Sequence, residues 1–171
     1  MLQTDYPCSN QISPSNRSRN YIEHLAERVA KKLHCRAGAD LESEVVPRLG
    51  GRVLRQQLSG EEPEGSVRVD GEGDFTIYLS PYIGRLRNRF TIAHELGHYF
   101  LHSLMGEKPI HVTEEGGGLT EREADWFAIG LLMPEKIFRK QARKLQTTEA
   151  LAAHFDVSPH LVKIRKESLG L

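Results

Sequence analysis

The sequence predicts an α+β fold: a small, antiparallel-containing sheet packed on two helices, followed by a helical C-terminal piece. Alternating apolar and polar residues at 67–69 and 75–80 are typical of short strands. Apolar residues recur at intervals of three and four over 89–102 and again over 124–132, which is the spacing of an amphipathic helix. Each apolar stripe needs a core to pack against, and the predicted sheet supplies one.

Length and composition indicate one domain of a cytoplasmic protein. The 171 residues suffice for a single domain with small appendages, and 23 basic against 23 acidic residues give no net attraction to nucleic acid or anionic membranes. No apolar run approaches the ~20 residues of a membrane span. The first residues lack the basic and apolar regions of a secretion signal. Cys8 and Cys35 lie outside any C-x-x-C pair, and we expect reduced thiols.

The first half of the chain predicts a flexible segment, two helices and a set of strands. Residues 1–18 are rich in Ser, Asn, Gln and Pro without periodicity, as in flexible segments. Helical spacing covers 19–34, and Asp40 is placed to cap a short second helix. Strands at 52–58, 67–69 and 75–80 fit a three-stranded antiparallel meander.

The predicted loop 80–88, which leads into the first long helix, is locally basic. The arginines of this stretch are Arg85, Arg87 and Arg89. A solvated basic face is the favoured interpretation, and contact with an acidic segment of a substrate is the alternative.

The strongest signal for chemistry is the H-E-x-x-H pattern at residues 94–98. Side chains four residues apart lie on one face of a helix, so the imidazoles of His94 and His98 can reach one metal ion. Glu95 lies on the same side, where it can take a proton from water at the metal. His102 follows one turn later, and we expect it either to hydrogen-bond a metal-binding group or to form another buried hydrogen bond. An amphipathic helix whose polar side chains merely face water is the plain alternative.

A third metal ligand is expected on the next helix. Two histidines and a glutamate form a known zinc set in hydrolases. Thr120 followed by Glu123 has the spacing of a capping box, which gives Glu123 a structural role at a helix start. Glu121 and Asp125 share another face of this helix. We therefore assign Glu121 to the metal and Asp125 to a hydrogen bond with a metal-binding imidazole.

At these residues the chain resembles the ImmA/IrrE family of bacterial and phage metallopeptidases. The resemblance rests on RFTIAHELGHYFLH at 89–102, on the E-x-x-A-D-x-F-A pattern at 121–128, and on Leu-Leu-Met-Pro at 131–134. The E-x-x-x-D spacing also resembles thermolysin-like zinc peptidases. Family members often carry Asn at the position of Asp125, and either side chain accepts a hydrogen bond from an imidazole.

The resemblance implies a zinc metallopeptidase that cleaves helix-turn-helix repressors or antitoxin-like regulators of stress, phage or mobile-element genes. It assigns the metallopeptidase domain to 19–146 and the hydrogen bond of Asp125 to His94. It also implies that a sheet edge beside the metal pairs with extended substrate, for which 75–80 is the candidate strand. A plain sheet that only covers the helices is the alternative.

The expected reaction is peptide-bond hydrolysis with one Zn²⁺ held by His94, His98 and Glu121, although the sequence leaves other divalent metals open. Glu95 is the expected catalytic base. A further group should stabilise the oxyanion, and the candidates are Tyr78, Tyr82, Tyr99, His111 and His160. A deformylase-type site requires Cys as a ligand, and neither cysteine has a suitable context.

Residues 147–171 resemble a helix-turn-helix, packed on the peptidase domain or appended to it. Ser158 and Pro159 have the pattern of a helix start. Possible DNA contacts are His160, Lys163, Arg165 and Lys166. Asp156 and Glu167 oppose binding, so a structural or partner-docking role is favoured. The alternative function for the whole chain is a zinc-containing regulator that binds a repressor or DNA without cutting it.

Overall fold

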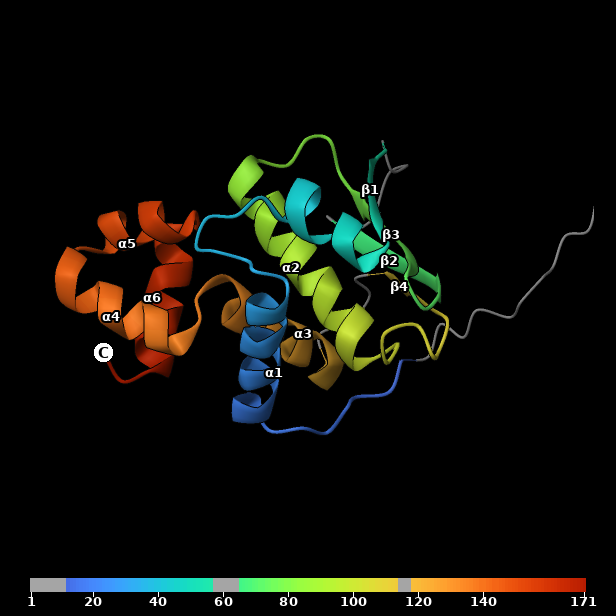
Figure 1. The fold of residues 1–171 in the computed structure, drawn as a ribbon, viewed down its shortest axis with the longest axis horizontal. Coiled ribbons are helices and arrows are strands. Elements are labelled where there is room, and N and C mark those ends of the chain that lie inside the picture. Colours follow the sequence, from blue (N-terminus) through green and yellow to red (C-terminus); the bar gives the residue numbers. More distant parts are fainter. Residues whose placement is uncertain (1–11, 57–64, 114–117) are drawn as a thin grey trace, which may run out of the picture.

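The computed structural model describes residues 12–56, 65–113 and 118–171, and arranges them as a sheet layered on helices (Figure 1). Within these residues four strands pair in the order β1-β3-β2-β4. The strands are β1 (Arg52–Arg55), β2 (Gly65–Gly71), β3 (Asp74–Leu79) and β4 (Ile110–Thr113). Strand β2 is antiparallel to both its neighbours, whereas β1 runs parallel to β3. The predicted α+β class with a small, antiparallel-containing sheet is confirmed.

Two details of the predicted sheet are wrong. The parallel pairing of β1 with β3 excludes a three-stranded meander, and β3 lies inside the sheet and not at its edge. Phe75, Ile77 and Leu79 of β3 are fully buried, which suits an interior strand. The edge strand β4 has only Ile110 and Val112 as buried apolar positions, too short an alternation to be recognised in the sequence. The part of the predicted first strand beyond residue 56 lies outside the described residues.

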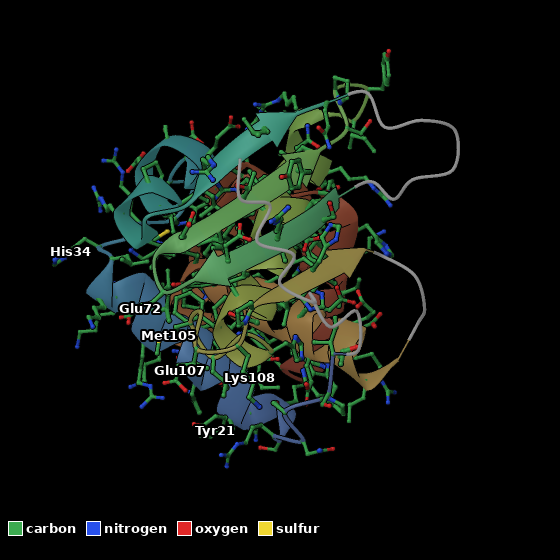
Figure 2. The ribbon with its side chains drawn as sticks, turned by 90° about the vertical axis from the view of Figure 1, so that its right-hand side faces the viewer. Tyr21, His34, Glu72, Met105, Glu107 and Lys108 are labelled. Carbon is green, nitrogen blue, oxygen red and sulfur yellow. The ribbon has the colours of Figure 1, made fainter. Side chains whose placement is uncertain are left out.

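One face of the sheet is covered by helices, and Figure 2 looks onto the other face with the helices behind it. The helices on that side are α1 (Arg19–Lys32), α2 (Arg85–Leu101) and α3 (Leu119–Leu132). Helix α2 packs on β2 and on α3, and α3 packs in turn on α1. Buried apolar residues of all these elements form one core. In the described part of the chain, no helix has the length and apolar content needed to cross a membrane.

Side chains cap the helical segments before the sheet, and the predicted cap at Asp40 is confirmed. Ser18 caps α1 by accepting a hydrogen bond from the Tyr21 amide, and α1 ends at Lys32, two residues before the predicted end. Asp40 accepts from the Glu42 and Ser43 amides and begins the short helical turn η1 (Leu41–Val45), which η2 (Pro47–Leu49) follows. Residues 1–11 of the predicted flexible segment, with Cys8, lie outside the described residues.

Helix α2 begins at Arg85, four residues before the predicted start, so most of the expected basic loop is helical. Arg85 donates two hydrogen bonds to the Asp156 carboxylate, at 2.5 and 2.7 Å. Arg89 is buried and donates to the Ala39 carbonyl oxygen. The expectation of a solvated basic face is therefore wrong at Arg89, whereas Arg85 and Arg87 are exposed as expected.

The C-terminal helices are α4 (Glu135–Leu145), α5 (Thr148–Phe155) and α6 (Pro159–Ser168). The hydroxyls of Thr147 and Ser158 cap α5 and α6. Arg165 of α6 is fully buried, and it donates to Glu23 of α1 at 2.5 Å and to the Met133 carbonyl at 3.0 Å. The ion pair thus links α6 to α1 within the buried part of the protein.

We predict that Glu23→Gln lowers the free energy of unfolding by about 3 kcal/mol, because it leaves the buried guanidinium of Arg165 without an anionic partner. Equilibrium denaturation measures this loss. Glu135→Gln is the control, because Glu135 and Arg139 form a partly exposed pair within α4 and the expected cost is below about 1 kcal/mol. Equal effects of the two variants would contradict the role given to the buried pair.

Candidate metal centre

Three side chains from two helices converge on one point. His94 and His98 lie one turn apart on α2, and Glu121 lies in the first turn of α3. Their candidate ligand atoms all fall within 4.8 Å of one another. The Nε2 atoms of His94 and His98 are 3.1 Å apart. One carboxylate oxygen of Glu121 lies 3.0 Å from His94 Nε2, and the other lies 3.5 Å from His98 Nε2. A shared cation suits this arrangement, because each group offers a lone pair to the same place.

The donor chemistry fits a divalent metal of the zinc type. Two imidazole nitrogens and one carboxylate oxygen form a set that leaves at least one position open for water or substrate. His98 is fully buried and His94 is 7% exposed, so little solvent competes at the ligands themselves. The residues present could therefore hold a metal ion.

Asp125 fixes the orientation of one imidazole. One turn after Glu121 on α3, its carboxylate accepts a hydrogen bond from Nδ1 of His94 at 2.9 Å. With the proton on Nδ1, the Nε2 lone pair of His94 points toward Glu121 and His98. The structure thus places Asp125 next to His94, the histidine named by the family resemblance.

The protonation tendencies of the three groups differ. Burial alone would lower the pKa of His94, but hydrogen bonds with Asp125 and Glu121 raise it to about 10. At His98 burial dominates, and the adjacent imidazoles help to lower the pKa to about 4. Burial would raise the pKa of Glu121, yet its hydrogen bonds with both histidines hold it well below its usual range. Neutral His98 and ionised Glu121 are ready to bind a metal, whereas His94 must first release a proton.

Glu95 is buried between α2 and the sheet, with 1% of its surface exposed. A Cβ atom added at Gly65 of β2 would lie 2.2 Å from Thr91 Cγ2 and 3.3 Å from a Glu95 carboxylate oxygen. Only glycine therefore lets β2 approach α2 closely at this point. The sequence interpretation did not single out Gly65, although a glycine at a strand start is a signal of close approach.

Glu123 does not cap its helix, so the predicted capping box is wrong. Gly118 is the N-cap residue of α3, and no side chain caps this helix end. Glu123 is instead fully buried and accepts hydrogen bonds from His102 and Ser15. Burial would raise the pKa of Glu123, but these hydrogen bonds hold it below its ordinary value.

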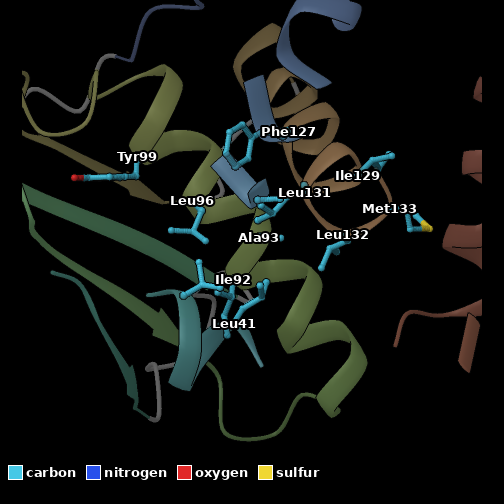
Figure 3. Packing of buried hydrophobic residues seen from close by; sticks show 14 of the residues in the cluster. Leu41, Ile92, Ala93, Leu96, Tyr99, Phe127, Ile129, Leu131, Leu132 and Met133 are labelled. Atoms are coloured by element: carbon cyan, nitrogen blue, oxygen red, sulfur yellow. The ribbon is translucent and has the colours of Figure 1, made fainter. Parts of the chain in front are cut away.

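A very close contact between α2 and α3 brings the ligands together. A Cβ atom at Gly97 would lie 2.9 Å from Ala124 Cα and 3.0 Å from the Ala124 carbonyl oxygen. Figure 3 shows Ala93, Leu96 and Phe127 packed near this crossing. Gly97 lies within the predicted helix 89–102, and its lack of a side chain is what the packing requires.

A cavity of about 510 Å³ lies next to His94 and reaches the C-terminal helices. Its lining is mainly apolar, and α6 contributes one wall. The lining residues are Leu86, Arg87, Phe90, Thr91, His94, Asp125, Ser158, His160, Leu161 and Ile164. An apolar hollow beside a metal-binding group has the character of a ligand site.

The structure separates the five candidate oxyanion donors. His160 lines the cavity next to His94. The hydroxyl of Tyr99 accepts a hydrogen bond from the Gly73 amide and its ring stacks on Phe75, so Tyr99 is a core residue and unsuited to this role (Figure 3). Tyr78 alternates with buried residues of β3 and so faces away from α2.

The remaining two oxyanion candidates are Tyr82 and His111. Tyr82 is 77% exposed in the turn before α2. His111 lies on β4, opposite Arg68 of β2. Neither position supports a role at the site, so of the five His160 stays the best placed.

The candidate DNA contacts do not form one exposed surface. Arg165 is fully buried in its ion pair with Glu23, so its assignment as a DNA contact is wrong. Lys166 is half-buried, with its amine 3.5 Å from the Thr148 hydroxyl. Lys163 and His160 are exposed. Local patterns in the sequence do not reveal which face of a helix packs on a distant element.

Comparisons with known proteins identify a family and a related metallopeptidase. The Peptidase_M78 family model, described as IrrE N-terminal-like domain, matches residues 50–167. The metallopeptidase ImmA of Bacillus subtilis (strain 168) is 31% identical over 122 residues, which cover 69% of this chain and 70% of that protein. A solved Mycobacterium tuberculosis transcriptional regulator shares the fold at a TM-score of 0.60 and 19% identity, over 86% of this chain. The chain spans about half of that regulator's length, 46%.

We predict that Gly97→Ala weakens zinc binding by a factor on the order of ten or more, because the new methyl group pushes α3 and Glu121 away from the histidines. Competition with a chromophoric chelator measures the dissociation constant. Gly130→Ala is a matched control, since its Cβ would lie 2.9 Å from Glu23 Cα of α1 and would strain a different helix contact. Both variants should lose stability. Unchanged zinc affinity in Gly97→Ala would contradict the account of the helix contact.

Proposed function

The chain belongs to the Peptidase_M78 family with its IrrE N-terminal-like domain, and on that basis we propose that it is a zinc-dependent endopeptidase that cleaves a regulatory protein. The observation that carries the proposal is the convergence of His94, His98 and Glu121, with Glu95 buried beside them. This geometry brings together a metal site and a carboxylate that can move a proton. A purely structural zinc site would ordinarily be closed by a fourth protein ligand.

His94, His98 and Glu121 would hold the ion, and Asp125 would keep His94 in the tautomer that binds. A bound divalent ion supplies Lewis acidity for the substrate carbonyl and lowers the pKa of water at the site. Glu95 takes a proton from the attacking water as the bond from oxygen to the carbonyl carbon forms. It then gives this proton to the amine nitrogen as the carbon–nitrogen bond breaks, so two shorter peptides result.

The sheet offers an edge for the main chain of a substrate. Strand β4 is an edge strand among the described residues, and its register sets Thr113 opposite Ser66. Ser66 follows Gly65, where an added Cβ atom would lie 3.3 Å from a Glu95 carboxylate oxygen. An extended peptide added to β4 would therefore run close to the reactive carboxylate. We propose β4 for this role in place of 75–80, which lies within the sheet.

The cavity between α2 and α6 would take a substrate side chain. Phe90, Leu161 and Ile164 give it an apolar lining directly beside His94. Its volume of about 510 Å³ accommodates a large apolar side chain. His160, exposed on the α6 wall, is the candidate that we retain for oxyanion stabilisation.

The proposed substrate is a helix-turn-helix repressor or an antitoxin-like regulator, as the ImmA/IrrE resemblance implies, and the proposed compartment is the cytoplasm. The second candidate is a zinc-containing regulator that binds a repressor or DNA without proteolysis. The helix-turn-helix-like pair α5 and α6 favours it, but the burial of Arg165 removes one of its basic contacts. Binding through α6 would also compete with its role as a cavity wall.

We predict that Glu95→Gln keeps one zinc ion per chain and lowers the cleavage rate at least ~10²-fold, because the amide cannot accept the proton. Elemental analysis gives the metal content, and mass spectrometry of co-expressed candidate regulators detects the shortened product. Glu107→Gln, at an exposed position after α2 (Figure 2), is the control and should cleave normally. Normal cleavage by Glu95→Gln would refute the proposed base.

The same variant separates the two candidate functions. An endopeptidase with Glu95→Gln should lose its effect on the genes that its substrate controls, whereas a non-proteolytic regulator should keep it. His94→Ala should lose the metal and both kinds of activity. Full zinc content in His94→Ala would count against the ligand set.

A further inference from the structure

A chain of hydrogen bonds runs from His98 through two buried side chains to the segment before α1. Nδ1 of His98 lies 2.9 Å from Nδ1 of His102, and Nε2 of His102 lies 3.0 Å from a carboxylate oxygen of Glu123. Ser15 donates to that carboxylate twice, from its backbone N–H at 2.8 Å and from its hydroxyl at 2.9 Å. His98, His102 and Glu123 are all buried.

We infer that His102, Glu123 and Ser15 are positioning residues, which hold His98 in the tautomer that binds metal and thereby set the metal affinity of the centre. The inference depends on the metal site and not on the reaction that follows. It gives a function to the segment 12–17, which otherwise only precedes α1.

The directions of the hydrogen bonds determine which nitrogen of His98 bears the proton. If Nε2 of His98 offers its lone pair to a metal, Nδ1 of His98 must bear the proton. That N–H donates to Nδ1 of His102, so His102 bears its own proton on Nε2. The second N–H then donates to the Glu123 carboxylate, which is an acceptor when ionised. Every link has one donor and one acceptor in this direction.

The reverse direction does not fit a metal site. A donor facing His102 from the position of Glu123 would shift the His102 proton to Nδ1. Nδ1 of His98 would then have to accept, and its own proton would lie on Nε2, where the metal binds. An anionic acceptor at position 123 therefore selects the binding tautomer of His98, as Asp125 does for His94.

Ser15 matters because a buried carboxylate is costly without hydrogen bonds. The two donors of Ser15 come from outside the α2–α3 pair, from a segment 108 positions before Glu123, and they stabilise the Glu123 anion. The segment runs from α1 toward the loop that follows α2 (Figure 1). A cavity of about 540 Å³ lies between residues 12–17 and 101–110. The contact with Glu123 is thus a defined anchor of this segment.

Zinc titration against a chromophoric chelator tests the inference on the full chain. We expect Glu123→Gln and His102→Phe to weaken zinc binding roughly 10- to 100-fold, the scale for groups that support metal ligands. Ser15→Ala, which keeps the backbone donor, should weaken it about fivefold. Ser15→Thr keeps both donors and should bind as the natural chain does.

Ser103→Ala is the matched control for loss of a hydroxyl. Ser103 follows His102, is buried, and donates to the Tyr99 carbonyl at 2.6 Å, outside the chain that ends at Ser15. Thermal unfolding of the metal-free variants should show a loss of stability for Ser103→Ala, but its zinc affinity should not change. A loss of zinc affinity that simply follows the loss of stability across all variants would overturn the inference.

Nitrogen-15 NMR of the imidazoles reports which ring nitrogen bears the proton. A purely structural role of Glu123 would leave that position unchanged. The zinc-loaded natural chain should show the proton of His98 on Nδ1 and that of His102 on Nε2, whereas Glu123→Gln should show a mixture at His102. A His102 proton on Nδ1 in the natural chain would overturn the inference, as would zinc affinities within roughly twofold of each other across the Glu123 and Ser15 variants.

Failure of this inference and failure of the proposed function give different results. Correct tautomers and graded affinities without any peptide cleavage would refute the proteolytic function and leave the positioning role in place. Glu95-dependent cleavage with the same zinc affinity in every variant would do the opposite.

Discussion

The contact between α2 and α3 at Gly97 and Ala124 is the constraint on which the site depends. Metal ligands on two helices can share one ion only if the helix axes approach closely, because a glutamate side chain is short. A methyl group at Gly97 would fall within 3.0 Å of the Ala124 backbone, so the present separation requires glycine. The sheet supports this contact from one side through β2, and α1 supports it from the other through its packing on α3. The sheet and α1 thus both help to keep α2 and α3 at the short separation that the metal ligands need.

Helix α3 carries three acidic residues with different surroundings. Glu121 faces the two imidazoles and Asp125, one turn on, faces Nδ1 of His94. Glu123 lies between them in sequence but points into the core, where His102 and Ser15 meet it. Each histidine of the pair therefore has an anionic group behind it, directly for His94 and through His102 for His98. This pairing points the Nε2 lone pairs of both rings toward the shared metal position, and it limits rotation of the rings.

The sequence was informative where the signal is local and periodic. The H-E-x-x-H helix, the caps at Asp40 and Ser158, and the α+β class follow from spacing within one element. The order of the strands could not be predicted in this way, because β4 is short and pairs with β2 far away in the chain. The true partners of Glu123 were missed for the same reason: its capping pattern is local, whereas Ser15 is 108 positions away. Arg165 likewise looked like a surface cation, since nothing nearby in the sequence points to Glu23.

The most direct test of the central claim is anomalous X-ray scattering at the zinc edge from crystals of the zinc-loaded protein. The account predicts one strong peak per chain, bounded by Nε2 of His94, Nε2 of His98 and the Glu121 carboxylate, at distances of about 2.0–2.2 Å from each ligand atom. A peak that lacks Glu121 as a neighbour, or that lies at Glu123 or elsewhere on the surface, would contradict it.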